Sequence, residues 1–148
     1  MKNKERIREL QGTNSFVFDS YALIGYLENE SFSDQIQNVL TQAKNGALRL
    51  YIHAIHIGEV YYITLREQGQ SSADLAYSRI KALPIKLIDR IDEELLLAAA
   101  GLKARYPISY ADSFAAALAM INNCPLLTGD PEFKSLEKKD IINIEWLT

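Results

Sequence analysis

Residues 16–27 read FVFDSYALIGYL. The first three are apolar, and the residue that follows them is an acid, Asp19. Beyond it, apolar side chains recur at the spacing of a helix face, namely Tyr21, Leu23, Ile24 and Leu27. The stretch therefore predicts a short buried strand over 16–18, a carboxylate at the end of that strand, and a helix directly behind it.

The same alternation of short apolar strands and helical stretches continues along the chain. Further strands are expected over 48–52, 85–88, 125–128 and 141–144, and further helices over 33–43, 54–66, 71–82, 93–104 and 109–122. Strands that alternate with helices predict an α/β protein, a three-layer α/β/α sandwich with a mostly parallel central sheet. In such sheets ligands bind at the carboxyl ends of the strands.

The length of 148 residues fits one domain with one core, and we expect a polar N-terminal extension over 1–15 and the domain over 16–148. The formal net charge of -3 gives no overall basic footprint for nucleic acid, so any phosphate contact must be local or carried by metal. A single cysteine, Cys124, excludes an intramolecular disulfide. Because no apolar run is long enough to cross a bilayer and no secretory signal is present, we expect a cytoplasmic protein without a membrane partner.

Three acids follow strands or open helices. Asp19 ends the first strand, and Asp130 follows the strand over 125–128 after one glycine, so both are expected at the same edge of the sheet. Each also fits as the cap of the next helix, since Asp130 precedes a proline. Asp112 lies three residues after Ser109, which resembles a capping box. Capping and a shared functional site both remain open for these three.

Glu59 is harder to explain as a structural residue. Its neighbours on the same helix face are Ile55 and Ile63, and a carboxylate on an apolar stripe is costly unless a charge meets it. The sequence around all four acids holds no Lys or Arg. None occurs between Arg8 and Lys44, between Arg49 and Arg66, or between Arg105 and Lys134. Hard divalent cations such as Mg²⁺ and Mn²⁺ prefer carboxylate oxygen, so the pattern predicts a metal site.

A zinc site made of His53, His56 and Glu59 is an alternative on the same helix. The spacing spreads the three side chains over about 120° of the helix, whereas zinc helices stack two histidines four residues apart. The spacing therefore argues against zinc.

At these residues the sequence resembles the PIN-domain ribonucleases, most closely the toxin components of VapBC-type toxin–antitoxin modules. The matching stretches are FVFDSYAL at 16–23, IGEV at 57–60, SYADSFAA at 109–116 and LLTGDPEF at 126–133. The resemblance implies an α/β/α fold, cleavage of RNA with Mg²⁺ or Mn²⁺, a homodimer, and inhibition by a small antitoxin. One departure is His53, which stands where many relatives carry a small hydroxyl residue.

The resemblance implies that four acids bind metal and are catalytic, namely Asp19, Glu59, Asp112 and Asp130. Metal would neutralise the phosphate oxygens and lower the pKa of water, so that hydrolysis leaves a 3′-hydroxyl and a 5′-phosphate. Three hydroxyls are expected to orient these carboxylates, those of Ser20, Ser113 and Thr128. Three cations are candidate RNA contacts: Lys103, Arg105 and Lys134.

We therefore expect a metal-dependent endoribonuclease that acts as the toxin of a toxin–antitoxin module. Two other functions remain open. One is a non-catalytic binding module that keeps the fold and its acids. The other is an aspartate-based phosphatase, although Tyr21 stands where the Asp-x-Asp pattern of such enzymes needs its second acid.

Overall fold

Five parallel strands form the centre of the computed structural model, which describes residues 14–148. They are β1 (Ser15–Phe18), β2 (Arg49–His53), β3 (Lys86–Ile88), β4 (Leu126–Thr128) and β5 (Ile144–Trp146). Their order in the sheet is β3-β2-β1-β4-β5, and every neighbouring pair is parallel. The expected extension over 1–15 lies outside the described residues except for its last two.

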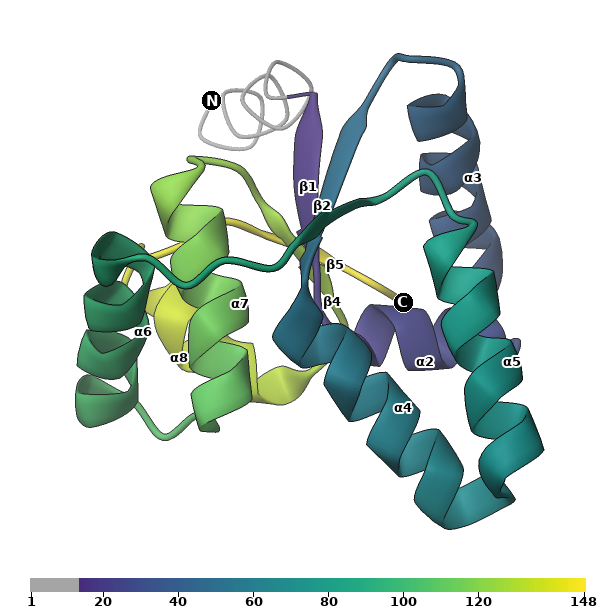
Figure 1. The fold of residues 1–148 in the computed structure, drawn as a ribbon. Coiled ribbons are helices and arrows are strands. Elements are labelled where there is room, and N and C mark those ends of the chain that lie inside the picture. Colours follow the sequence, from purple (N-terminus) through teal and green to yellow (C-terminus); the bar gives the residue numbers. More distant parts are fainter. Residues whose placement is uncertain (1–13) are drawn as a thin grey trace.

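Helices cover both faces of this sheet (Figure 1). On one side lie α2 (Ser20–Leu27), α3 (Ser33–Lys44), α4 (Ala54–Gln68) and α5 (Gln70–Lys81). On the other lie α6 (Glu93–Arg105), α7 (Tyr110–Ile121), the 3₁₀ turn η1 (Pro131–Phe133) and α8 (Lys134–Lys138). The predicted three-layer α/β/α sandwich is confirmed.

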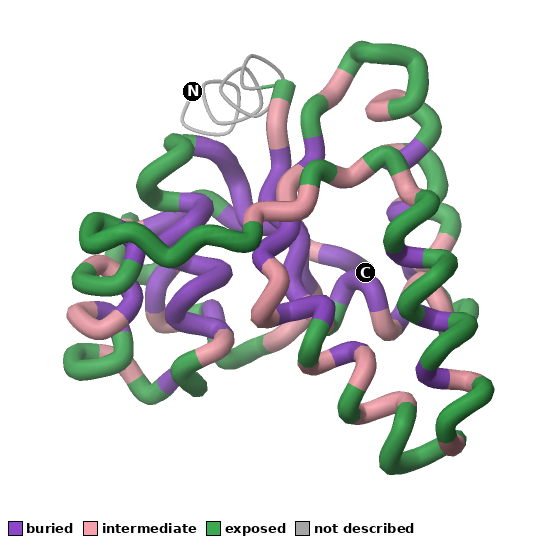
Figure 2. The backbone as a smooth tube through the Cα atoms, in the orientation of Figure 1, coloured by how far each residue is buried: buried purple, intermediate pink, exposed green. Residues whose placement is uncertain are grey.

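The side chains of β1 and β4 alternate between the two faces, as a strand dictates. Val17 and Leu126 belong to the apolar core under α6 and α7, whereas Phe18 and Leu127 belong to the core under α2, α3 and α4. Buried residues gather along the central strands and α7 (Figure 2). Four of the five alanines of α7 are among them, so this helix packs close to the sheet: Ala115, Ala116, Ala117 and Ala119.

The chain builds β2 and β3 on one side of β1 before it returns to build β4 and β5 on the other. A topological switch point therefore lies between the carboxyl ends of β1 and β4, where open α/β sheets bind their ligands. No helix in the described part of the chain is long and apolar enough to cross a membrane.

The boundaries agree with the predicted ones within two residues except at the last strand. The prediction of 141–144 is wrong, because β5 spans Ile144–Trp146 and pairs Ile144 with Leu126. The N–H of Ile141 instead donates to the carbonyl of Leu136 (3.0 Å), and Asp140 has a φ of 56°, so the chain is still turning after α8. Ile142 is buried as part of the core before the strand begins.

Candidate metal centre

The four acids singled out from the sequence converge at the switch point. Asp19 follows β1 and Asp130 follows β4, while α4 carries Glu59 and α7 carries Asp112. Their charges act on one another, because the Asp130 carboxylate raises the pKa of the other three. Segments that are far apart in the sequence thus place four carboxylates at one edge of the sheet.

Asp19 has its two carboxylate oxygens fixed by different partners. Oδ1 accepts from the N–H of Ala22 (2.9 Å) and so caps α2, while Oδ2 accepts from the hydroxyl of Thr128 (2.5 Å). The side chain is only 1% exposed, and this burial raises its pKa to about 7 in spite of both hydrogen bonds. The capping interpretation of Asp19 is confirmed, and it is compatible with a place in the centre, since each oxygen has a second lone pair.

Thr128 joins Asp19 to Asp130. Its hydroxyl donates to Asp19, and its oxygen accepts from the backbone N–H of Asp130 (3.0 Å). Asp130 in turn caps η1, because its Oδ1 accepts from the N–H of Glu132 (2.9 Å). One buried hydroxyl therefore holds the ends of β1 and β4 in a fixed relation.

Asp112 lies in the first turn of α7, where Ser109 caps the helix and accepts from the N–H of Asp112 (3.1 Å). Burial is the largest cause that raises the pKa of Asp112 to about 8, and the nearby carboxyls of Glu132, Asp130 and Asp19 contribute in the same direction. The Ser109 side chain acts in the opposite direction. In the metal-free protein these neighbouring carboxyls therefore favour a bound proton at neutral pH.

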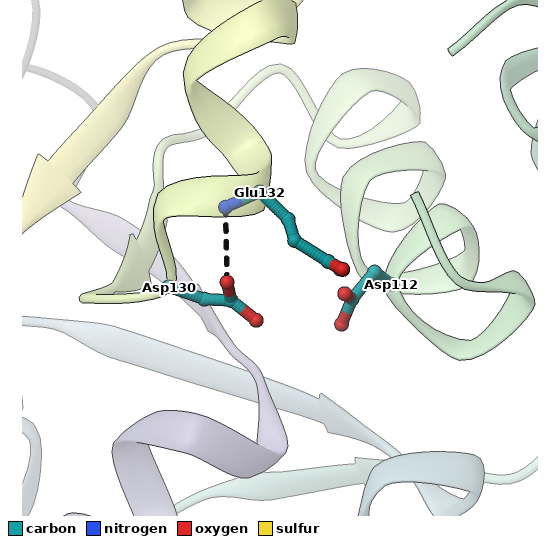
Figure 3. Close-up of side chains that lie close together, drawn as sticks. All are labelled: Asp112, Asp130 and Glu132. Atoms are coloured by element: carbon teal, nitrogen blue, oxygen red, sulfur yellow. Dashed lines mark hydrogen bonds between the residues drawn. The ribbon is translucent and has the colours of Figure 1, made fainter. Parts of the chain in front are cut away.

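Glu132 is a fifth acid of this centre, and the sequence reasoning missed it. Asp112, Asp130 and Glu132 each place one carboxylate oxygen within 4.8 Å of the others. Figure 3 shows the three side chains pointing toward one another, Asp112 from α7 and the other two from the turn after β4. The signal was present in the sequence as a second acid directly after Pro131, but the sequence reasoning considered only Asp130 as a cap or site residue.

Glu59 brings an unpaired oxygen to the group. Its side chain is half-buried, and Oε1 is buried with no hydrogen-bond partner among the described residues. Burial raises the pKa of Glu59 and the Ser20 side chain lowers it. A buried carboxylate oxygen without a donor is costly, so this position fits a cation.

Within residues 14–148, no Lys or Arg is among the groups that shift the pKa values of Asp19, Glu59 and Asp112. The donor set is made of carboxylate oxygens, which hard divalent cations prefer. The residues present therefore fit a divalent metal such as Mg²⁺ or Mn²⁺, held by a subset of the five acids.

The remaining predicted site residues are Ser113 and three cations, and the structure shows no side-chain hydrogen bond from any of them to the acids within residues 14–148. Ser113 is buried, but its hydroxyl donates to the carbonyl of Ser109 (2.9 Å), so the structure gives it no bond to a carboxylate. Lys103 donates to the carbonyl of Ile108 (2.8 Å) in the loop that leads to α7. Arg105 ends α6 and Lys134 begins α8, and both are exposed.

The two histidines of the zinc alternative are engaged elsewhere. His53 caps α4, because its Nδ1 accepts from the N–H of Ile55 (3.1 Å), and its Nε2 lies 3.0 Å from the carbonyl oxygen of Arg90. Nδ1 thus accepts the hydrogen bond at the start of α4 that a small hydroxyl side chain would accept in this position. The Nε2 of His56 also lies against a backbone carbonyl. The arrangement gives no support to zinc.

Replacement of Thr128 by valine should destabilise the protein by about 1–3 kcal/mol, because the partly buried Asp130 N–H loses its acceptor and the buried Asp19 carboxylate loses its donor. Thr128→Ser keeps the hydroxyl and should retain most of the stability. Urea unfolding of the three proteins measures the difference. Equal stability of the valine variant and the wild type would show that the hydroxyl does not tie the two strand ends together.

The fold and its carboxylate cluster define an α/β/α domain with an acidic centre at the switch point. The profile of the PIN domain matches residues 16–139, so the chain belongs to the PIN-domain family. No curated protein sequence matches it significantly.

Solved structures share this fold at low sequence identity. VapBC2 from Rickettsia felis, bound to a DNA fragment from its promoter, has a TM-score of 0.71 at 14% identity over 90% of this chain and 99% of that one. VapBC-1 from nontypeable Haemophilus influenzae has a TM-score of 0.66 at 16% identity over 90% and 98%. Mycobacterium tuberculosis VapC20, a toxin that cleaves the sarcin-ricin loop, has a TM-score of 0.64 at 12% identity over 81% and 93%.

Proposed function

We propose that this PIN domain is a metal-dependent endoribonuclease and the toxin of a toxin–antitoxin pair. The observation that carries the proposal is the acidic centre itself. It gathers carboxylates that raise one another's pKa values, together with a buried Oε1 on Glu59 that has no partner among the described residues. A protein that only needed helix caps would have no reason to collect five acids at one strand edge.

Metal would be held by the carboxylates of the predicted set together with the one that the structure adds: Asp19, Glu59, Asp112, Asp130 and Glu132. When bound, it would neutralise phosphate oxygens and lower the pKa of water. The chain's own part is to fix the oxygens. Thr128 orients Asp19, Ser109 caps the turn that carries Asp112, and Ser20 lies against Glu59. Protons held at Asp19 and Asp112 would leave as metal binds.

RNA is the proposed substrate, and a small antitoxin and a second copy of the chain are the proposed partners. Lys103, Arg105 and Lys134 would supply local positive charge that a chain with net charge -3 lacks overall. The structural likeness to VapBC proteins and to a toxin that cleaves an RNA loop supports this proposal. An Arg or Lys of the antitoxin that entered the acidic centre would compete with metal.

The purified protein should cleave single-stranded RNA in Mg²⁺ or Mn²⁺ and stop in EDTA. Products that carry a 3′-hydroxyl and a 5′-phosphate identify hydrolysis by water, whereas attack by the RNA 2′-hydroxyl leaves a cyclic phosphate. Gel analysis of end-labelled RNA reads both features. Cleavage that continues unchanged in EDTA, or none with either metal, would contradict the proposal.

A further inference from the structure

His56 lies three residues before Glu59 on α4 and has no part in the proposed metal centre. Its side chain is 0% exposed. The ring reaches α7, where Nε2 lies 2.8 Å from the carbonyl oxygen of Ala111, the residue directly before Asp112. A polar side chain in the core thus connects the helix that carries Glu59 to the turn that carries Asp112.

The direction of this hydrogen bond follows from the surroundings of the ring. Burial lowers the pKa of His56 to about 4, so the imidazole is neutral and carries one N–H. Nε2 faces a carbonyl oxygen, which can only accept, so the proton is on Nε2 and Nδ1 is left as an acceptor with no donor among the described residues. Nε2–H therefore donates to Ala111.

Packing alone does not explain a histidine at this position. A buried Nδ1 without a partner costs free energy, and an aliphatic side chain of similar size would avoid that cost. The N–H that the ring donates is the one feature such a side chain lacks. The ring is also braced by its neighbours, since it meets His53 edge-on (6.5 Å between centroids) and His53 lies 6.1 Å from the ring of Phe114 on α7.

We propose that His56 is a positioning residue: its hydrogen bond to Ala111 sets the separation of α4 and α7, and through it the spacing of the Glu59 and Asp112 carboxylates. The inference rests on the proposed metal centre. Apolar helix contacts can shift slightly as side chains repack, whereas a hydrogen bond holds its two heavy atoms near 2.9 Å. Metal ligands need such fixed positions, and the groups that orient them strongly affect affinity.

The test compares a variant without a donor to one that keeps it. In His56→Leu the N–H is lost, while in His56→Gln the side-chain amide can donate to Ala111. Ile57→Ala is the matched control, because Ile57 is buried on the same helix but packs in the opposite core. Calorimetry measures the Kd for Mn²⁺, thermal melting measures Tm, and hydrogen exchange measures the opening of the first turn of α7. His56→Met is a second donor-free variant should His56→Leu not fold.

We expect His56→Leu to raise the Kd for Mn²⁺ about tenfold or more and His56→Gln to stay within about threefold of the wild type. Ile57→Ala should lower Tm and leave the Kd unchanged. Equal affinities for His56→Leu and the wild type would overturn the inference and leave the proposed function standing.

If the wild-type protein bound no Mn²⁺, that result would contradict the proposed function instead. Hydrogen exchange of the metal-free proteins would then test the role of His56. Faster exchange in the first turn of α7 for His56→Leu, but not for His56→Gln or Ile57→Ala, supports the positioning role. Equal exchange in all four proteins overturns it.

Discussion

Asp19→Asn should reduce metal-dependent RNA cleavage by at least about a hundredfold, which corresponds to a loss of about 2.7 kcal/mol or more of transition-state stabilisation. The substitution removes one negative charge from the most buried acid of the centre and leaves its volume unchanged. Asparagine can still accept from the N–H of Ala22, so α2 keeps its cap. Initial rates of RNA cleavage at saturating Mn²⁺ measure the effect.

Asp92→Asn is the matched control for this variant. Asp92 caps α6 in the same way, by accepting from the N–H of Leu95 (2.9 Å), but it does not belong to the acidic centre. We expect this control to cleave RNA at the wild-type rate. If Asp19→Asn kept wild-type turnover while it remained folded, the assignment of the centre would be wrong.

The fold could be predicted because its signals are local. An apolar run of three residues followed by a helical repeat defines β1 and α2, and alternation of such units determines a parallel sheet. The position of Asp19 and Asp130 at one edge then follows from topology, since carboxyl ends of parallel strands lie together. The error at β5 has the same origin: Ile141 and Ile142 are apolar because the core needs them, not because they form a strand.

The contacts within the centre could not be predicted, because they join residues far apart in the chain. The bond from Thr128 to Asp19 spans 109 positions, and that from His56 to Ala111 spans 55. A hydroxyl or an imidazole gives no local signal of its distant partner. Glu132 was missed for a different reason, since Asp130 and Pro131 already explained the turn.

From the sequence, a helix cap and a place in the metal centre were alternative roles for the same acids. The structure shows that one carboxylate can cap a helix and also lie in the acidic centre. Asp19 and Asp130 each use one oxygen for a backbone N–H. Helix N-termini carry partial positive charge, which favours an acid there. The caps therefore place the carboxylates, and the placement creates repulsion that only protons or a cation can relieve.

This repulsion predicts how the stability of the metal-free protein depends on pH. The pKa of Asp112 rises from an ordinary 3.8 to about 8 on folding, and that of Asp19 from 3.8 to about 7. At a pH between the unfolded and the folded pKa, the folded protein binds a proton that the unfolded chain has released. The free energy of unfolding must therefore fall as pH rises through this range. In EDTA we expect stability to decrease from about pH 4 to about pH 8. Urea unfolding at a series of pH values measures this slope.

Asp112→Asn removes the group with the largest of these shifts. In EDTA at pH 7.5 the variant should be more stable than the wild type by roughly 1–3 kcal/mol, because the wild type must take up a proton or bury a charge at this position when it folds and the variant need do neither. Mn²⁺ at a hundredfold excess over its Kd should stabilise the wild type by about 2.7 kcal/mol and the variant by less. The Tm of the variant should therefore exceed that of the wild type by less, or fall below it, when metal is added.

Asp34→Asn provides the control for charge at a helix start, since Asp34 lies in the first turn of α3 and is exposed. We expect that variant to lose only a few tenths of a kcal/mol, equally with EDTA and with Mn²⁺. A purely structural Asp112 would behave like Asp34 and melt below the wild type under both conditions. That result, together with melting of the wild type that does not respond to metal, would reduce the acids to helix caps and remove the basis of the nuclease proposal.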